Sequence, residues 1–134
     1  MDFNEIIQPG MAHEVTFTVE ESHLALHIGS GSTRVLATPW MIAFMERTSH
    51  RMIANHLPDG YSSVGVLVNV RHLAPSLLGS SVKARAEVLS VEGAQVTFKV
   101  QAWDETDLIG EGTHDRFIIE LERFLRRLTA KQKG

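Results

Sequence analysis

Cysteine is missing from all 134 residues of the chain. Its absence excludes disulfide bonds, zinc sites built on thiolates and catalysis by a cysteine nucleophile. The sequence also lacks any apolar run near the roughly 20 residues that a membrane-spanning helix needs, and it has no hydrophobic stretch typical of a secretory leader. We therefore expect a cytoplasmic protein with no membrane partner.

An excess of positive charge is missing as well. The net charge is -3 at pH 7, so no basic stripe is available to phosphates and we expect no nucleic-acid partner. The locally basic "ERFLRRLTAKQKG", residues 122–134, is interpreted as a solvated helical tail. Apolar residues make up 43% and charged residues 22% of the chain, and no repeat or linker divides it. We expect a single domain over residues 1–134, with its core at about 12–124.

One long helix is predicted before the C-terminal tail. Thr38 is suited to the N-cap, Pro39 fits the first turn, and the proline and glycine of "LPDGY" stop the helix near Leu57. At 100° per residue, Arg47 and Arg51 point away from one stripe of mostly apolar residues. That stripe consists of Met41, Ile42, Met45, Ser49, Met52, Ile53 and His56.

The remaining pattern is that of strands. Alternation predicts strands at 13–19, 64–73, 81–91, 94–104 and 108–121, and residues 23–28 are a further candidate. Short links between the last four strands predict an antiparallel meander. One face of residues 64–72 carries Val64, Val66, Val68, Val70 and His72, and the other carries Gly65, Leu67, Asn69 and Arg71. One apolar sheet face and one long helix predict an α+β domain in which a curved sheet wraps around the helix.

Such a sheet has long edges, and a single helix does not cover its whole inner face. Pairing two sheets edge to edge across a two-fold axis removes both problems, so we expect a homodimer. Whether two such dimers stack into a tetramer stays open.

Three polar residues converge where the helix meets the valine-rich strand. Thr38 begins the helix, His72 ends the strand, and Glu46 lies at the edge of the apolar stripe, where a carboxylate needs a partner. Each residue alone has an ordinary structural explanation, as a cap, a paired carboxylate or a core histidine. A glutamate and a histidine at one buried seam are nevertheless a natural acid–base pair.

The order Thr38, Glu46, His72 resembles that of hotdog-fold thioesterases of the fluoroacetyl-CoA thioesterase type. The resemblance runs from about Val15 to Phe124. It includes the 8- and 26-residue spacings of the three residues and the late "GEGTHDR" strand, with glycines at 110 and 112, a histidine at 114 and an arginine at 116. No helix follows this "GEG", so it is not a nucleotide-binding loop.

The resemblance implies a hotdog fold and an acyl-CoA thioesterase whose site lies at a dimer interface. It implies that Thr38, Glu46 and His72 are catalytic, with His72 as general acid–base and Thr38 as a hydrogen-bond donor to the carboxylate or the acyl group. Glu46 would activate water or attack the thioester carbonyl itself. Gly65 and Arg116 also match family positions near the substrate. No metal or bound cofactor is implied, because CoA arrives with the substrate.

Several alternatives stay open at this point. Gly65 is equally explained by close strand packing, and Arg116 by a surface ion pair. If both residues are helical, the eight positions between Thr38 and Glu46 separate them by roughly 12 Å along the helix axis. Three explanations stay open: Thr38 meets the Glu46 of another subunit, Thr38 contacts the substrate instead of Glu46, or the helix starts later. A non-catalytic acyl-CoA-binding module on the same scaffold is the main alternative function, and a hotdog hydratase or dehydratase is another.

One departure from the family pattern concerns the acyl group. The fluoroacetyl-specific type has bulky aromatic residues just before the threonine, where they cover the acyl pocket. This chain has no aromatic residue from Gly29 to Ala37. Selectivity for fluoroacetyl-CoA is therefore open, and a broader preference for short or medium acyl chains is equally consistent with the sequence.

Overall fold

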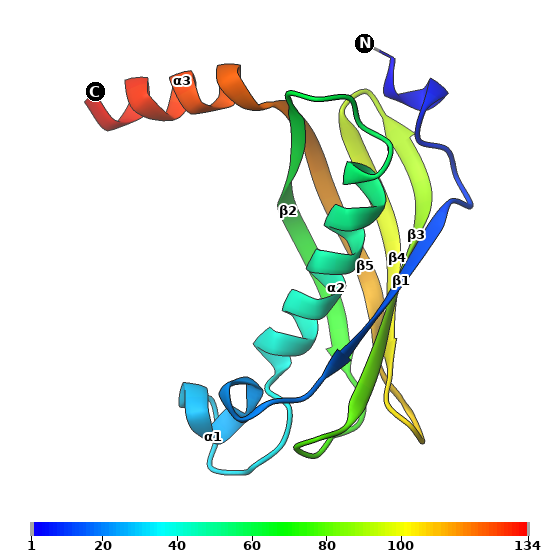
Figure 1. Cartoon of the computed structure of the whole chain (residues 1–134), viewed down its shortest axis with the longest axis vertical. Coiled ribbons are helices and arrows are strands. Elements are labelled where there is room, and N and C mark those ends of the chain that lie inside the picture. The colour runs from blue at the N-terminus through cyan, green and yellow to red at the C-terminus, as the bar shows by residue number, and fades with distance from the viewer. Residues whose placement is uncertain (1, 134) are drawn as a thin grey trace.

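A long helix, α2 (Thr38–Ala54), lies in the concave face of a curved five-stranded antiparallel sheet (Figure 1). The computed structural model describes residues 2–133. The strands are β1 (Ala12–Thr18), β2 (Tyr61–His72), β3 (Ser81–Glu92), β4 (Gln95–Trp103) and β5 (Leu108–Glu120). The other helices are the short η1 (Phe3–Glu5), η2 (Glu21–His23) and α1 (Ala25–Ile28), and the C-terminal α3 (Leu121–Lys133). The predicted α+β class, with a hotdog-like sheet wrapped around one helix, is confirmed.

The strand order is β1-β3-β4-β5-β2, which corrects the predicted meander. Strands β3, β4 and β5 do follow one another, but β2 pairs with β5 instead of with β3. The link from β2 to β3 spans residues 73–80, which is longer than a hairpin loop, and it crosses the end of the sheet. As a result β2 is an edge strand.

A bulge in β2 corrects the predicted valine face. The pairing with β5 shifts between Gly65 and Leu67, so Val66 is an extra residue in the strand. Beyond the bulge the alternation changes phase. Gly65 and His72, predicted on opposite faces, therefore both face α2.

Two local predictions for the segment before α2 are wrong. Residues 23–28 are not a strand, because Leu24 and Ala25 are buried side by side and Gly29, at a φ of 75°, ends the short helix α1. Thr38 is not the N-cap either: Ala37 occupies that position, and Thr38 is the first helical residue. Its hydroxyl is thereby available to another partner.

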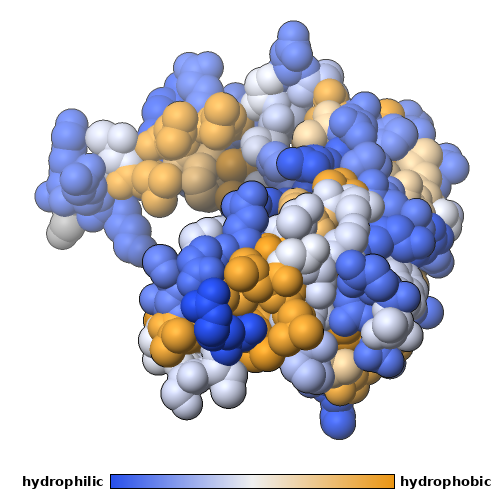
Figure 2. Space-filling view, turned by 60° about the horizontal axis from the view of Figure 1, so that its bottom comes forward, coloured by the Kyte–Doolittle hydropathy of each residue, from blue (hydrophilic) through white to orange (hydrophobic). Residues whose placement is uncertain are grey.

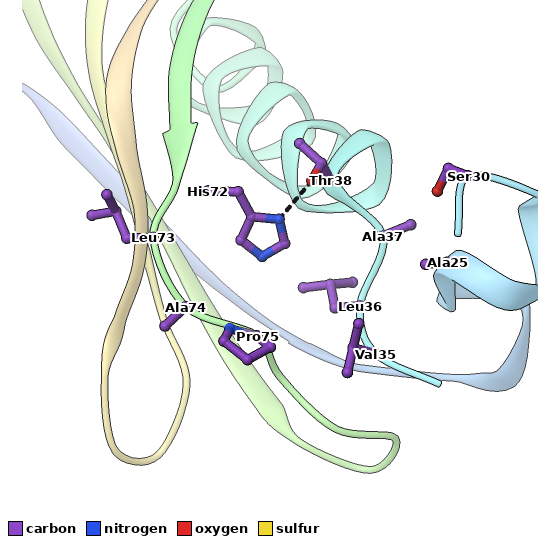
Figure 3. Close-up of a pocket in the computed structure, with 10 residues that line it drawn as sticks. All are labelled: Ala25, Ser30, Val35, Leu36, Ala37, Thr38, His72, Leu73, Ala74 and Pro75. Atoms are coloured by element: carbon purple, nitrogen blue, oxygen red, sulfur yellow. Dashed lines mark hydrogen bonds between the residues drawn. The ribbon is translucent and has the colours of Figure 1, made fainter. Parts of the chain in front are cut away.

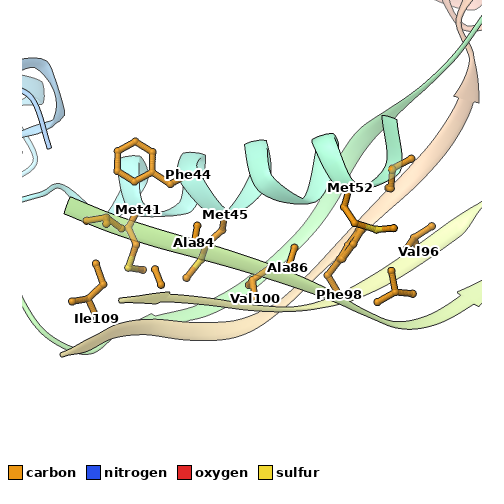
Figure 4. Packing of buried hydrophobic residues seen from close by; sticks show 14 of the residues in the cluster. Met41, Phe44, Met45, Met52, Ala84, Ala86, Val96, Phe98, Val100 and Ile109 are labelled. Carbon is orange, nitrogen blue, oxygen red and sulfur yellow. The ribbon is translucent and has the colours of Figure 1, made fainter. Parts of the chain in front are cut away.

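The core fills the space between α2 and the sheet (Figure 4). Phe44 and Thr48 join the buried stripe of α2, whereas His56 lies beyond the end of the helix and is exposed. Beneath them the sheet contributes Ala84, Ala86 and other small or branched residues, which let the helix approach closely. None of the helices in residues 2–133 is long and apolar enough to cross a membrane.

Candidate active site

Thr38 and His72 form a direct pair at the start of α2. The Oγ1 of Thr38 lies 2.7 Å from the Nδ1 of His72, at the end of β2 (Figure 3). The two residues are 34 positions apart in sequence, and the pair forms because β2 and α2 pack against each other. The predicted convergence of these two residues is therefore present in one chain.

The other ring nitrogen of His72 has no partner. Its Nε2 is buried and makes no hydrogen bond within residues 2–133, which costs about 1–3 kcal/mol unless a ligand or water satisfies it. Burial lowers the pKa of His72 below the ordinary 6.5, and the backbone of Ala74 opposes this to a smaller extent. The imidazole is thus neutral at pH 7 and able to exchange a proton.

A cavity of about 340 Å³ adjoins the pair. Its walls come from α1, from the segment that leads into α2 and from the link after β2 (Figure 3). The lining residues are Ala25, Ser30, Val35, Leu36, Ala37, Thr38, His72, Leu73, Ala74 and Pro75. Apart from the pair and Ser30 the lining side chains are apolar, and the start of α2 adds the positive end of the helix dipole.

Glu46 lies elsewhere on α2, at a second pocket of about 480 Å³. Its carboxylate is half-exposed and lies 3.9 Å from the guanidinium of Arg116. Arg47, His50 and Arg51 also line this pocket, so its charge is mainly positive. The predicted need of Glu46 for a partner is met by Arg116.

Arg116 is not in a surface ion pair, because only 6% of it is exposed. Its Nε donates to the Oγ of Ser63 at 2.9 Å, and one of its terminal nitrogens donates to the carbonyl of Ser63 at 3.0 Å. Its other terminal nitrogen lies 3.2 Å from the Nε2 of His114 and is also the one nearest Glu46. Burial lowers the pKa of Arg116, and the charge of Glu46 opposes this.

His114 contacts Arg116 and helps to hold its guanidinium in place. Its Nδ1 lies 2.8 Å from the carbonyl of Leu67, at the β2 bulge, so Nδ1 carries the proton and Nε2 accepts from Arg116. Sequence reasoning gave no role to Ser63 or His114. For His114 a signal existed, since it precedes Arg116 by two residues on one strand and shares its face.

Gly65 lies against the same cluster. A Cβ on Gly65 would lie 3.0 Å from Oε2 of Glu46 and 3.4 Å from Arg116. Gly65 therefore lies beside Glu46 and Arg116, and its role in binding substrate stays a prediction.

Within one chain the structure does not bring Glu46 to Thr38 and His72. The two pockets share no lining residue, and the axial rise of roughly 12 Å between Thr38 and Glu46 keeps them apart. Each chain therefore holds two separate clusters, Thr38–His72 and Glu46–Arg116. No group of three or more histidine, aspartate or glutamate side chains in residues 2–133 is placed to hold a metal ion.

Comparison with known proteins adds a family context. Residues 19–122 match the family model described as FlK, fluoroacetyl-CoA-specific thioesterase. A fluoroacetyl-CoA thioesterase from Streptantibioticus cattleyicolor is 39% identical over 97 residues, which are 72% of this chain and 70% of that protein.

Solved structures of similar proteins have the same fold. The fluoroacetyl-CoA thioesterase FlK superposes with a TM-score of 0.86 at 32% identity, over 93% of this chain and 97% of that chain. A hot-dog-like protein from Thermanaerovibrio acidaminovorans has a TM-score of 0.92 at 26% identity, over 100% and 99% of the two chains. A thioesterase superfamily member from Thermus thermophilus has a TM-score of 0.84 at 30% identity, over 95% and 96%.

Proposed function

Since the chain belongs to the family of fluoroacetyl-CoA-specific thioesterases, we propose that it hydrolyses an acyl-CoA at a site shared by two subunits. The hydrolysis of a thioester follows from the family itself, so the protein is a thioester hydrolase. The location of the active site between two subunits is the part that goes beyond the family assignment. Its main support is the Thr38–His72 pair, whose buried Nε2 has no partner within residues 2–133.

In this proposal the acyl group enters the cavity beside Thr38 and His72. The positive end of α2 stabilises the oxyanion of the thioester carbonyl. His72 accepts the proton of water and returns it to the departing CoA thiolate, with Thr38 orienting the ring. Glu46 either polarises this water or first attacks the carbonyl carbon and expels CoA thiolate. In the second case His72 takes the proton of the water that hydrolyses the resulting anhydride and passes it to the thiolate. The reaction needs no metal or bound cofactor, and CoA leaves with the product.

The edge strand β2 supports a homodimer. Its residues 65–71 are exposed except for a partly buried Val70, and Val66, Leu67 and Val68 are 56%, 48% and 40% exposed. Antiparallel pairing with the β2 of a second copy would cover these side chains and complete the hydrogen bonds of the edge.

The same pairing would complete the site. A two-fold axis through the middle of the exposed stretch, at Val68, sets His72 level with the partner subunit's Val64 and Gly65. Because of the bulge at Val66, it is Gly65 that shares the strand face of His72. Glu46 lies against Gly65 within each chain. The Thr38–His72 half-site of one subunit thus meets the Glu46–Arg116 half-site of the other.

Mixing two inactive variants tests this arrangement. His72→Ala and Glu46→Ala should each fold and lose most turnover, because each removes one half-site residue. In a shared site, a heterodimer of the two has one active site with both defects and one with neither. An equal mixture, refolded together, should then regain about a quarter of the wild-type activity.

Recovery of no activity from the mixture would refute the shared site, since a site within one subunit always lacks one of the two residues. Arg85→Ala is the matched control, because Arg85 lines neither pocket, pairs with Glu14 and Glu87 and should leave turnover nearly unchanged. If all three variants keep full activity, the catalytic assignment itself is wrong.

The acyl group is the second part of the proposal. The segment that walls the cavity carries Ser30, Val35, Leu36 and Ala37, and no aromatic residue lies between Gly29 and Ala37. We infer a preference that extends over short- to medium-chain acyl groups instead of fluoroacetyl alone. Thiol release from a panel of acyl-CoAs measures this directly, and the cysteine-free protein contributes no thiol of its own. Turnover of fluoroacetyl-CoA alone would contradict it.

A further inference from the structure

The C-terminal helix α3 has an apolar side that the rest of the chain leaves uncovered. Leu121, Leu125 and Leu128 follow at spacings of four and three and so share one face; they are 43%, 51% and 45% exposed. The helix projects past the edge strand β2 instead of folding back on the body (Figure 1). Its polar side is basic, with one glutamate against five cations: Arg123, Arg126, Arg127, Lys131 and Lys133.

The starting point of α3 directs it toward the proposed partner. The backbone N–H of Leu121 donates to the carbonyl of Gly60 at 2.9 Å, and Glu120 pairs with Tyr61. The helix therefore begins at the first residue of β2 and runs outward from there. At 1.5 Å per residue, Leu125 and Leu128 lie about 6 and 10 Å along the axis. Adjacent strands are about 4.8 Å apart, so both leucines reach the position of a partner's β2.

The partner would present its own uncovered leucines at this point. With the two-fold axis at Val68, Tyr61 lies level with the segment that follows β2 in the partner, close to the partner subunit's Pro75. In each chain the leucines around Pro75 are among the most exposed: Leu73 at 49%, Leu77 at 68% and Leu78 at 46%. Figure 2 shows apolar residues gathered along α3 and, across a hollow, a second apolar group at the end of the molecule turned toward the viewer.

Charge favours the same match. The Oγ of Ser76 donates to Asp104 at 2.8 Å, and the backbone N–H of Ser81 donates to Glu105 at 3.0 Å. These bonds hold the acidic β4–β5 turn, which also contains Asp107, beside the exposed leucines. If the leucine face of α3 packs on these exposed leucines, the arginine and lysine side chains of α3 lie close to the acidic turn.

The leucine-rich end also borders the Thr38–His72 cavity, because Ala74 and Pro75 line it and directly follow Leu73, whose own side chain points away from the cavity (Figure 3). We propose that α3 of each subunit packs its leucine face on the partner subunit's Leu73, Leu77 and Leu78 and closes the partner's acyl cavity. This rests on the proposed dimeric site. The segment Gly29–Ala37 has no aromatic residue to cover the acyl cavity. In this proposal α3 of the other subunit covers the cavity instead. The C-terminal leucines then help to set acyl selectivity.

Disulfide cross-linking tests the contact, because the chain has no cysteine of its own. Leu125→Cys protein is mixed with Leu77→Cys protein, refolded together and oxidised. A covalent heterodimer on a non-reducing gel is the expected result. Arg123→Cys, about 160° round α3 from Leu125 and with a side chain 65% exposed, is the control and should cross-link far less. Equal cross-linking from both positions would overturn the proposal.

A kinetic experiment tests the role in selectivity. Leu125→Gln combined with Leu128→Gln keeps the helix propensity but removes the apolar cover. The ratio of kcat/KM for a medium-chain acyl-CoA to that for acetyl-CoA should fall about 10-fold, while Ala130→Gln, on the opposite face of α3, leaves it unchanged. A ratio within twofold of wild type, in a protein that is still dimeric, would overturn the proposal. Loss of the dimer in the leucine variant alone would support the contact.

Two further outcomes separate the competing explanations. If wild-type α3 instead carries the protein onto vesicles containing phosphatidylserine, and Leu125→Cys does not cross-link, then the leucine face binds lipid and the proposal fails. Cross-linking requires no turnover. A cross-linked but inactive protein would therefore contradict the proposed function alone, and an active enzyme without the cross-link would contradict only the role of α3.

Discussion

Replacing Gly65 by alanine would place a methyl group against the carboxylate of Glu46. The new Cβ would lie 3.0 Å from Oε2 of Glu46, 3.2 Å from the ring of His114 and 3.4 Å from Arg116. The first contact requires Glu46 to retreat by a few tenths of an ångström. A misplacement of 1 Å near the reacting atoms costs about 100-fold in rate, so we expect a loss of roughly 3- to 10-fold in kcat/KM.

Stability should change little in the same variant. Gly65 does not have a positive φ. The nearest crowded atom is the end of a flexible, half-exposed side chain, and the buried ring of His114, at 3.2 Å, must also shift by a few tenths of an ångström. Alanine also restricts the unfolded chain, which stabilises the protein by about 0.4–1 kcal/mol. The melting temperature should therefore stay within about 4 °C of wild type.

Thiol release and thermal unfolding, measured on the same preparation, check both parts. Unchanged turnover in Gly65→Ala would refute the placement of Glu46 at the reacting centre. A large fall in melting temperature, with activity lost in proportion, would show instead that Gly65 serves the packing of the strand.

Two other predictions concern stability. Gly112→Ala should lower the free energy of unfolding by about 3 kcal/mol or more, because the new Cβ would lie 2.6 Å from the backbone of Val70. That backbone cannot move without breaking the β2–β5 pairing. A variant that melts like wild type would contradict this prediction. Burial lowers the pKa of His114 below 6.5; the charge of Arg116 adds to this effect and the Leu67 carbonyl opposes it. At this residue the unfolded chain therefore binds more protons than the folded chain below pH 6.5. Stability should then be full above that pH and fall as the pH drops below it, and a melting series from pH 8 to 5 should show a shallower slope in His114→Gln.

Much of the fold could be predicted from local patterns. The run from Thr38 carries a helical period, and the segments after it alternate with a period of two, so α2 and strands β2 to β5 were expected close to where they occur. The convergence of Thr38 and His72 was predictable too, because it requires only that the helix start and the strand end pack together.

Other features were beyond local patterns because they depend on which strand lies beside which. The pairing of β2 with β5 was missed, and with it the edge on which the proposed dimer depends. The burial of Arg116 was missed for the same reason: its hydrogen-bond partner Ser63 lies 53 residues away, on the neighbouring strand.

The sequence by itself determined the helix, the strands and the family, and it singled out Thr38, Glu46 and His72 as the predicted catalytic side chains. Only the tertiary structure decided that Glu46 pairs with Arg116 and lies apart from Thr38 and His72 in one chain. The bulge at Val66 is the physical reason that Gly65 and His72 face the same helix, since one extra residue reverses the alternation of the strand. A period of two in the sequence does not reveal such an insertion, because the bulge is set by the register with β5.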